Sequence, residues 1–208
     1  MFAGANSAVT ENAPKAVAPW SAGQSVLVGR TDKLNPPFAE MVNGAAGHAL
    51  YFDDVDRPAN AHPSAVILPA LLALASERSD SGRELLDAHI LGVEVMQRLG
   101  EARNMDHYLR GWLSTVKLGT LGAAAACARI ARFDYANTAS AISLGGSIAS
   151  RASQTKAAIL PSSYTLVSPR KTASWLALAS RLASTPVTAP SAWPGRWARI
   201  ALRNFRPR

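Results

Sequence analysis

Acidic residues are missing from the last 58 residues of this 208-residue chain. Residues 151–208 contain ten Lys or Arg and no Asp or Glu, which gives this segment a net charge of +10. Residues 1–150 carry 12 basic and 14 acidic side chains, so their net charge is −2. The basic character of the whole chain therefore comes entirely from its tail.

Cysteine and long apolar runs are also scarce. The single cysteine, Cys127, excludes an internal disulfide, and its Ala-rich surroundings indicate a buried thiol in a reducing compartment. The longest apolar run, residues 65–75, is too short to span a bilayer and contains Pro69. The first residues, MFAGANSAVTENAPK, do not have the pattern of a signal peptide. We therefore expect a cytoplasmic protein without membrane contact.

Helical periodicity is the main feature of residues 1–150. Apolar residues recur at spacings of three and four, and Ser81 with Glu84 forms a capping-box pattern at the start of one helix. Small residues such as Gly119 and Gly122 favour close helix packing, and no Gly-Lys-Ser/Thr follows them to suggest a phosphate loop. Residues 1–36 are expected to be loop, with a strand-like run at 25–28. The sequence predicts an all-α domain with helices over about residues 36–50, 64–76, 81–99, 115–132 and 137–150.

Three stretches of this domain resemble the MmgE/PrpD family, which includes 2-methylcitrate dehydratases and cis-aconitate decarboxylases. They are MVNGAAGHALYFDDVDRPANAHPSAVILPALLALASE, SGRELLDAHILGVEVMQRLGEA and HYLRGWLSTVKLGTLGAAAACARI. The resemblance implies a helical domain with an α+β lid domain, a homodimer, and lyase chemistry on a small tricarboxylate without a metal or another cofactor. Against that pattern, we expect residues 1–150 to form a partial helical domain that lacks the first helices and the lid.

The resemblance also implies site residues. His62, before Pro63, matches the family's active-site His, whereas Tyr51 and Leu113 stand where the family has a catalytic Asp and a second His. Leucine cannot exchange a proton, and a phenol with a pKa of about 10 is a poor base near neutral pH. We therefore expect this chain to be catalytically impaired or inactive. Three further residues match family positions that shape the site: His48, Asp53 and Asp54.

The acid-free tail is explained by a shifted reading frame that begins near Ser150. The codons CGG AAA ACG GCG TCA TGG are permitted for Arg170–Trp175, and reading from the third base gives Glu-Asn-Gly-Val-Met. The family continues with a similar Glu-Asn-Gly sequence at this place. We expect residues 151–208 to be an out-of-frame, poorly ordered basic tail.

Other interpretations of the same residues remain open. The chain is alternatively a non-catalytic helical module that binds a partner, or its basic tail with Trp175, Trp193 and Trp197 binds nucleic acid. We do not expect a nucleic-acid partner, because the tail has no periodic basic face. An acidic turn around Asp53, Asp54 and Asp56 is a weak candidate for a divalent cation. The spacing of His48, His89 and His107 gives no reason to expect zinc.

Overall fold

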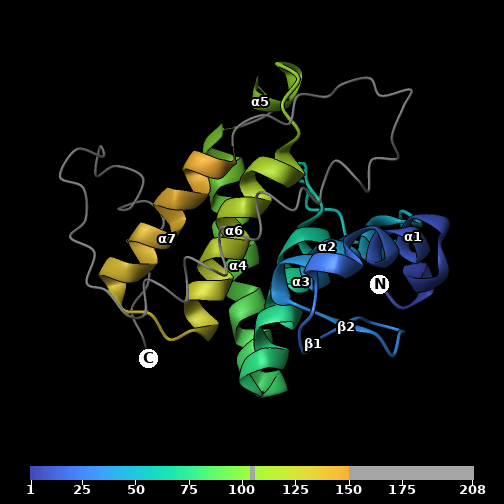
Figure 1. The fold of residues 1–208 in the computed structure, drawn as a ribbon. Helices are drawn as coiled ribbons and strands as arrows, with labels where there is room; N and C mark the ends of the chain where they lie inside the picture. The colour runs from blue at the N-terminus through green and yellow to red at the C-terminus, as the bar shows by residue number, and fades with distance from the viewer. Residues whose placement is uncertain (104–105, 150–208) are drawn as a thin grey trace.

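Helix α6, Ser114–Ile130, lies at the centre of a helical domain (Figure 1). The computed structural model describes residues 1–103 and 106–149. Helices α3, Pro63–Arg78, and α4, Gly82–Arg103, pack against α6, and α7, Tyr135–Ile148, covers its other side. Helix α2, Pro36–His48, packs on α3, and α1, Ala8–Val17, packs on α2. The prediction of an all-α fold is confirmed.

The helices α3, α4 and α6 form the main apolar core, with Ile67, Leu71 and Met96 fully buried among them. Close approach of α4 and α6 depends on small residues. A Cβ added at Gly92 would lie 2.9 Å from the Gly122 carbonyl oxygen, and one added at Gly122 would lie 2.7 Å from that of Gly92. The sequence-based expectation that Gly122 serves helix packing is confirmed.

The predicted helix positions agree with the structure to within a few residues. The capping box at α4 is formed: the backbone N–H of Ser81 donates to Glu84 Oε2 at 3.0 Å, and that of Glu84 donates to Ser81 Oγ at 3.3 Å. Helix α7 begins two residues earlier than expected, because the Asp134 side chain caps its N-terminus by accepting from Asn137 N–H. A short helix that was not expected, α5, spans Asp106–Leu109.

The expectation that residues 1–36 form a loop is wrong for the first half of this segment, whereas the expected strand-like run at 25–28 does contain a short strand. Residues 1–36 contain α1, two short 3₁₀ helices (Ala3–Asn6 and Ala18–Trp20), and an antiparallel pair of two-residue strands. The strands are β1, Ser25–Val26, and β2, Lys33–Leu34. Pro14 lies inside α1, where it removes a backbone donor, and the helix nevertheless forms because Ala13 and Val17 pack against α2.

Polar side chains attach the first strand to the helical body. Asn43 of α2 accepts from Val28 N–H and donates to the Val26 carbonyl, both at 2.9 Å. The Ser25 hydroxyl donates to the Ala73 carbonyl of α3 at 3.0 Å.

No helix in the described ranges, 1–103 and 106–149, is both long and apolar enough to cross a bilayer. The expected tail, residues 151–208, lies outside the described residues.

Candidate functional site

Three chain segments meet where α2 ends and where α3 and α6 begin. His48 is the last residue of α2, and His62 is the N-cap residue of α3. The loop between them carries Asp53. The backbone N–H of His62 donates to Thr115 Oγ1 at 3.1 Å, which attaches the start of α3 to the first turn of α6. Residues that are distant in sequence thus form one side-chain group.

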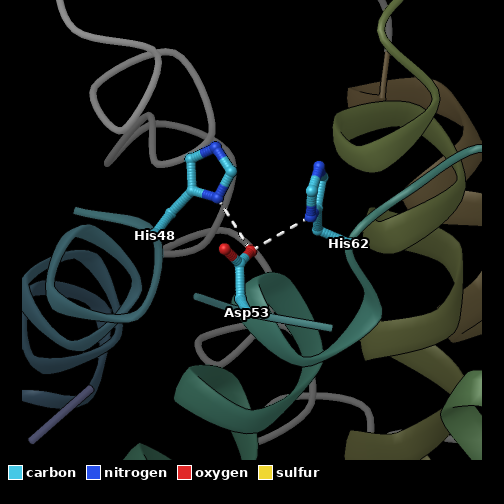
Figure 2. Close-up of side chains that lie close together, drawn as sticks. All are labelled: His48, Asp53 and His62. Atoms are coloured by element: carbon cyan, nitrogen blue, oxygen red, sulfur yellow. Dashed lines mark hydrogen bonds and ion pairs between the residues drawn. The ribbon is translucent and has the colours of Figure 1, made fainter. Parts of the chain in front are cut away.

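Asp53 lies between the two histidines, and both rings face its carboxylate (Figure 2). His48 Nδ1 is 2.8 Å from Asp53 Oδ2, and His62 Nδ1 is 3.2 Å from the same oxygen. His48 and Asp53 are buried, with side-chain exposures of 5% and 6%, whereas His62 is 32% exposed. His62 is therefore the member of the group that solvent or a ligand reaches most easily.

The partners of the two rings determine which nitrogen carries hydrogen. His62 Nδ1 also lies 3.0 Å from the Asp54 carbonyl oxygen. Carbonyl and carboxylate oxygens only accept, so each Nδ1 donates a hydrogen. The Nε2 atom of each neutral ring then keeps its lone pair and is the atom that exchanges protons. Asp53 orients two bases in the way that the Asp of a catalytic triad orients its His.

The loop between the histidines is fixed by hydrogen bonds at both ends. Asp54 accepts from the backbone N–H of Ser64 at 3.0 Å and from its hydroxyl at 2.9 Å, so it caps α3. Asp56 pairs with Ala61 through two backbone hydrogen bonds, and its carboxylate accepts from Ala59 N–H at 2.8 Å. These bonds pre-organise the loop and limit the positions that Asp53 can take.

Tyr51 and Leu113, which the resemblance matches to a family Asp and a family His, lie on the loop after α2 and at the start of α6. The Tyr51 ring centroid is 4.8 Å from that of His48, and the Tyr51 backbone has φ of 56°, in the left-handed region. Asp occupies that region more readily than an aromatic residue does, so a Tyr at this position carries backbone strain. Leu113 is the half-buried N-cap residue of α6, two residues before Thr115, and its side chain provides no cap.

The other charged residues near the site have separate partners. His89 Nε2 is 3.5 Å from Ser64 Oγ, and burial lowers the pKa of His89, an effect that the Asp54 charge partly offsets. Asp54 and Asp56 bind the backbone of α3 and of the loop, and they do not share a cation site with Asp53. By contrast, one ligand atom from each of His48, Asp53 and His62 lies within 4.8 Å of the others, a spacing that a metal ion can use.

A pocket of about 180 Å³ lies beside the group. Asp53 and Ser64 contribute to its wall together with Leu50, Phe52 and Leu68. Within the described part of the chain its lining includes no Lys or Arg, the side chains that would neutralise a polycarboxylate. We therefore do not assign the pocket to a substrate.

Sequence reasoning identified His62, His48, Asp53 and Asp54, and the structure brings all four together. Sequence reasoning did not identify Thr115, Ser64 or the hydrogen bonds by which Asp56 holds the loop. Local patterns contain no signal for Thr115, because its contact with His62 joins residues 53 positions apart. Ser64 follows His-Pro directly, and a Ser in the first turn of a helix is a visible signal for an N-terminal hydrogen bond.

Comparisons with known proteins identify the family to which the sequence is similar. A sequence model described as the MmgE/PrpD N-terminal domain matches residues 1–196, so the matched range extends past Ser150. The chain is 36% identical to cis-aconitate decarboxylase of Mus musculus over 146 residues, which cover 64% of this chain and 29% of that protein. It is 36% identical to cis-aconitate decarboxylase of Homo sapiens over 143 residues, which cover 64% and 30%. The cis-aconitate decarboxylase-like protein oryM of Aspergillus oryzae is 31% identical over 144 residues, which cover 65% and 30%. The chain thus matches less than a third of the length of these relatives.

Proposed function

Because the chain belongs to the MmgE/PrpD family, we propose that it provides the histidine-bearing part of a lyase site for a small tricarboxylate. The observation that carries the proposal is the contact of His48 and His62 with one carboxylate oxygen of Asp53. Two of the relatives are cis-aconitate decarboxylases, so cis-aconitate is the first substrate to test, followed by 2-methylcitrate.

The chemistry requires a proton donor and acceptor at His62. Loss of CO₂ from cis-aconitate leaves an electron pair on the carbon that carried the carboxylate, and this carbon must receive a proton. A protonated His62, held through its Nδ1–H, delivers that proton from Nε2. Dehydration of a 2-hydroxy tricarboxylate needs the same atom to accept a C–H proton or to protonate the departing hydroxyl. Asp53 acts as a positioning residue that orients the ring and stabilises its charged form.

This chain lacks two groups that the family pattern has beside His62. Leu113 offers no proton, and Tyr51 replaces a carboxylate by a phenol whose ring contacts His48. Removing one member of a proton-transfer group typically reduces the rate by about 10²–10⁴-fold. We therefore propose that the chain binds a tricarboxylate at His62 and converts it very slowly or not at all.

Two measurements on the purified chain test this proposal. Addition of cis-aconitate should shift the ¹H NMR signals of the His62 ring, which the His62→Gln variant identifies by their loss. The signals of His89 should shift less, and His89→Gln serves as the matched control. Absence of any His62 shift with either substrate would overturn the binding proposal. A turnover that disappears in His62→Gln would overturn the proposed loss of activity.

A second candidate function is binding of a protein partner through α4. Leu86 and Ile90 are one helical turn apart on this helix and are 55% and 58% exposed. A pair of exposed aliphatic side chains favours an interface, and a homodimer is the state that the family implies. Sedimentation of the wild type and of the Leu86→Lys/Ile90→Lys variant tests this. The interface is supported if the variant alone is monomeric.

We also propose a cytoplasmic location, because the single cysteine, Cys127, is a buried free thiol, as expected in a reducing compartment.

A further inference from the structure

Asp54 binds Ser64 with its side chain and His62 with its backbone. Its carboxylate accepts from the Ser64 backbone N–H at 3.0 Å and from the Ser64 hydroxyl at 2.9 Å. Its carbonyl oxygen lies 3.0 Å from His62 Nδ1. A single residue of the loop thus connects the first turn of α3 to the ring that the proposed lyase chemistry uses.

The Asp54 carbonyl is the nearer of the two acceptors of the His62 ring. The other acceptor, Asp53 Oδ2, is 3.2 Å from His62 Nδ1 and is shared with His48 Nδ1, which lies 2.8 Å from it. The two rings approach that oxygen from different sides (Figure 2). Because His62 has only part of the Asp53 oxygen, the Asp54 carbonyl contributes directly to keeping hydrogen on His62 Nδ1.

Packing does little to hold this part of the loop. Phe52, which precedes the Asp53–Asp54 pair, is 86% exposed, and Val55, which follows it, is 65% exposed. Side chains so exposed bury little apolar surface, so they fix the backbone weakly. The hydrogen bonds from Ser64 therefore have a direct effect on the direction of the Asp54 carbonyl.

We propose that Ser64 is a positioning residue for His62, because its hydroxyl holds Asp54 with the carbonyl directed at His62 Nδ1. The inference rests on the proposed function, in which His62 Nε2 exchanges protons with a ligand. When the carbonyl turns away, the neutral ring is freer to carry its hydrogen on Nε2 instead. In that tautomer Nε2 has no lone pair, so it cannot accept a proton.

His89 of α4 lies on the other side of the Ser64 hydroxyl, with its Nε2 atom 3.5 Å from Ser64 Oγ. The hydroxyl donates its hydrogen to Asp54, so Ser64 Oγ is an acceptor toward His89, and His89 Nε2 carries hydrogen. His89 Nδ1 is buried without a hydrogen-bond partner among the described residues, and burial lowers the pKa of this ring. We therefore expect a neutral His89 whose hydrogen is on the opposite nitrogen from that of His62.

Nitrogen-15 NMR of the full chain, without ligand and at a pH where both rings are neutral, distinguishes the two tautomers. In the wild type, His62 should carry hydrogen on Nδ1 and His89 on Nε2, and the loss of signals in His62→Gln and His89→Gln assigns the two rings. In Ser64→Ala, the fraction of His62 with hydrogen on Nε2 should rise by at least about twofold, the lower end of the range for one lost hydrogen bond.

Two further variants at position 64 form a matched pair. The side chains in Ser64→Thr and Ser64→Val have nearly the same shape, and only the first has a hydroxyl. Ser64→Thr should keep the wild-type tautomer ratio of His62, whereas Ser64→Val should change it as Ser64→Ala does. His89→Gln removes the ring beside Ser64 but neither of the bonds from Ser64 to Asp54, so it should leave the His62 ratio unchanged.

Several results would overturn the positioning role. They are hydrogen on Nε2 of His62 in the wild type, an unchanged His62 ratio in Ser64→Ala and Ser64→Val, and equal changes in Ser64→Thr and Ser64→Val. A change in His89→Gln as large as that in Ser64→Ala also contradicts it. A purely structural role of Ser64 predicts a lower melting temperature at an unchanged ratio, so melting is measured in parallel. Because these spectra need no ligand, failure of the wild type to respond to cis-aconitate contradicts the proposed function and leaves this result standing.

Discussion

Gln97 donates a hydrogen bond of 2.5 Å from its Nε2 atom to Asp56 Oδ1, and this bond attaches the middle of α4 to the loop that carries Asp53. Asp56 is buried, with a residue exposure of 8%. Its other carboxylate oxygen accepts from Ala59 N–H, so both oxygens hold the loop closed. The geometry of the candidate site thus depends on a helix that contributes no side chain to it.

Replacing Gln97 should loosen that loop. In Gln97→Ala, Asp56 Oδ1 is left buried without its donor, and we expect a loss of about 1–3 kcal/mol in the free energy of unfolding. Urea denaturation measures the loss, and hydrogen exchange at the Ala61 amide should become faster. Gln24→Ala removes a long, exposed contact with Lys33 and should change little. Equal effects from the two variants would contradict the anchoring role.

Gly92 should be essential for the contact between α4 and α6. A Cβ there would lie 2.9 Å from Ala126 Cβ and from the Gly122 carbonyl oxygen, so Gly92→Ala should destabilise the fold by about 1–3 kcal/mol. Gly82 lies in the same helix with nothing within 4 Å of an added Cβ. Gly82→Ala should therefore be neutral or stabilising by up to about 1 kcal/mol. Thermal melting of the two variants measures this contrast, and a stable Gly92→Ala protein would contradict the packing.

Glu84 should make stability depend on acid pH. The Ser81 backbone hydrogen bond, together with Arg132, lowers the pKa of Glu84 from 4.5 to about 2. A lowered folded-state pKa means that the unfolded chain takes up a proton first, so this stabilisation is complete above pH 4.5 and disappears as the pH falls to about 2. The melting temperature of Glu84→Gln should thus be below that of the wild type at neutral pH, and the two should converge in acid. Glu94→Gln, which removes another exposed carboxylate of α4, controls for net charge.

Glu40 should have the opposite effect on how stability depends on pH. Burial raises the pKa of this α2 carboxyl well above 4.5. Burial also raises the pKa of the Cys127 thiol, and the charge of Glu40 raises it further. A raised folded-state pKa means that the wild type loses stability as the pH rises above 4.5. Glu40→Gln cannot ionise, so it should lose less stability over that range. Chemical denaturation at a series of pH values tests this, and parallel curves for the two proteins would contradict it.

The reading frame of the acid-free tail is tested at the level of DNA. We expect the nucleotide sequence after the codon of Ser150 to encode, in another frame, a segment with Asn-Phe and Glu-Asn-Gly elements. The family match extends to residue 196 and so includes most of this segment, which makes the nucleotide sequence the decisive measurement. An uninterrupted frame, with close relatives that end in the same peptide, would show that the tail is genuine.

Local sequence patterns determined the positions of most helices of this protein. The capping box at Ser81, the continuous apolar run of α3 and the small residues of α6 act over a few helical turns, so the positions of these helices were predictable. Family resemblance supplied His62 and its neighbours as candidates. Helix α1 was not predictable, because Pro14 normally ends or kinks a helix and this one is stabilised by packing on α2.

Only the tertiary structure decided how the candidates are arranged. His48 and His62 are 14 positions apart, and nothing in their spacing indicates that both rings meet at Asp53 Oδ2. That meeting depends on contacts with Thr115 and, through Asp56, with Gln97, which come from helices far along the chain. A sequence pattern repeats at the period of one helix or strand, whereas a site is made by side chains from elements that pack together, so its geometry exists only in the folded chain.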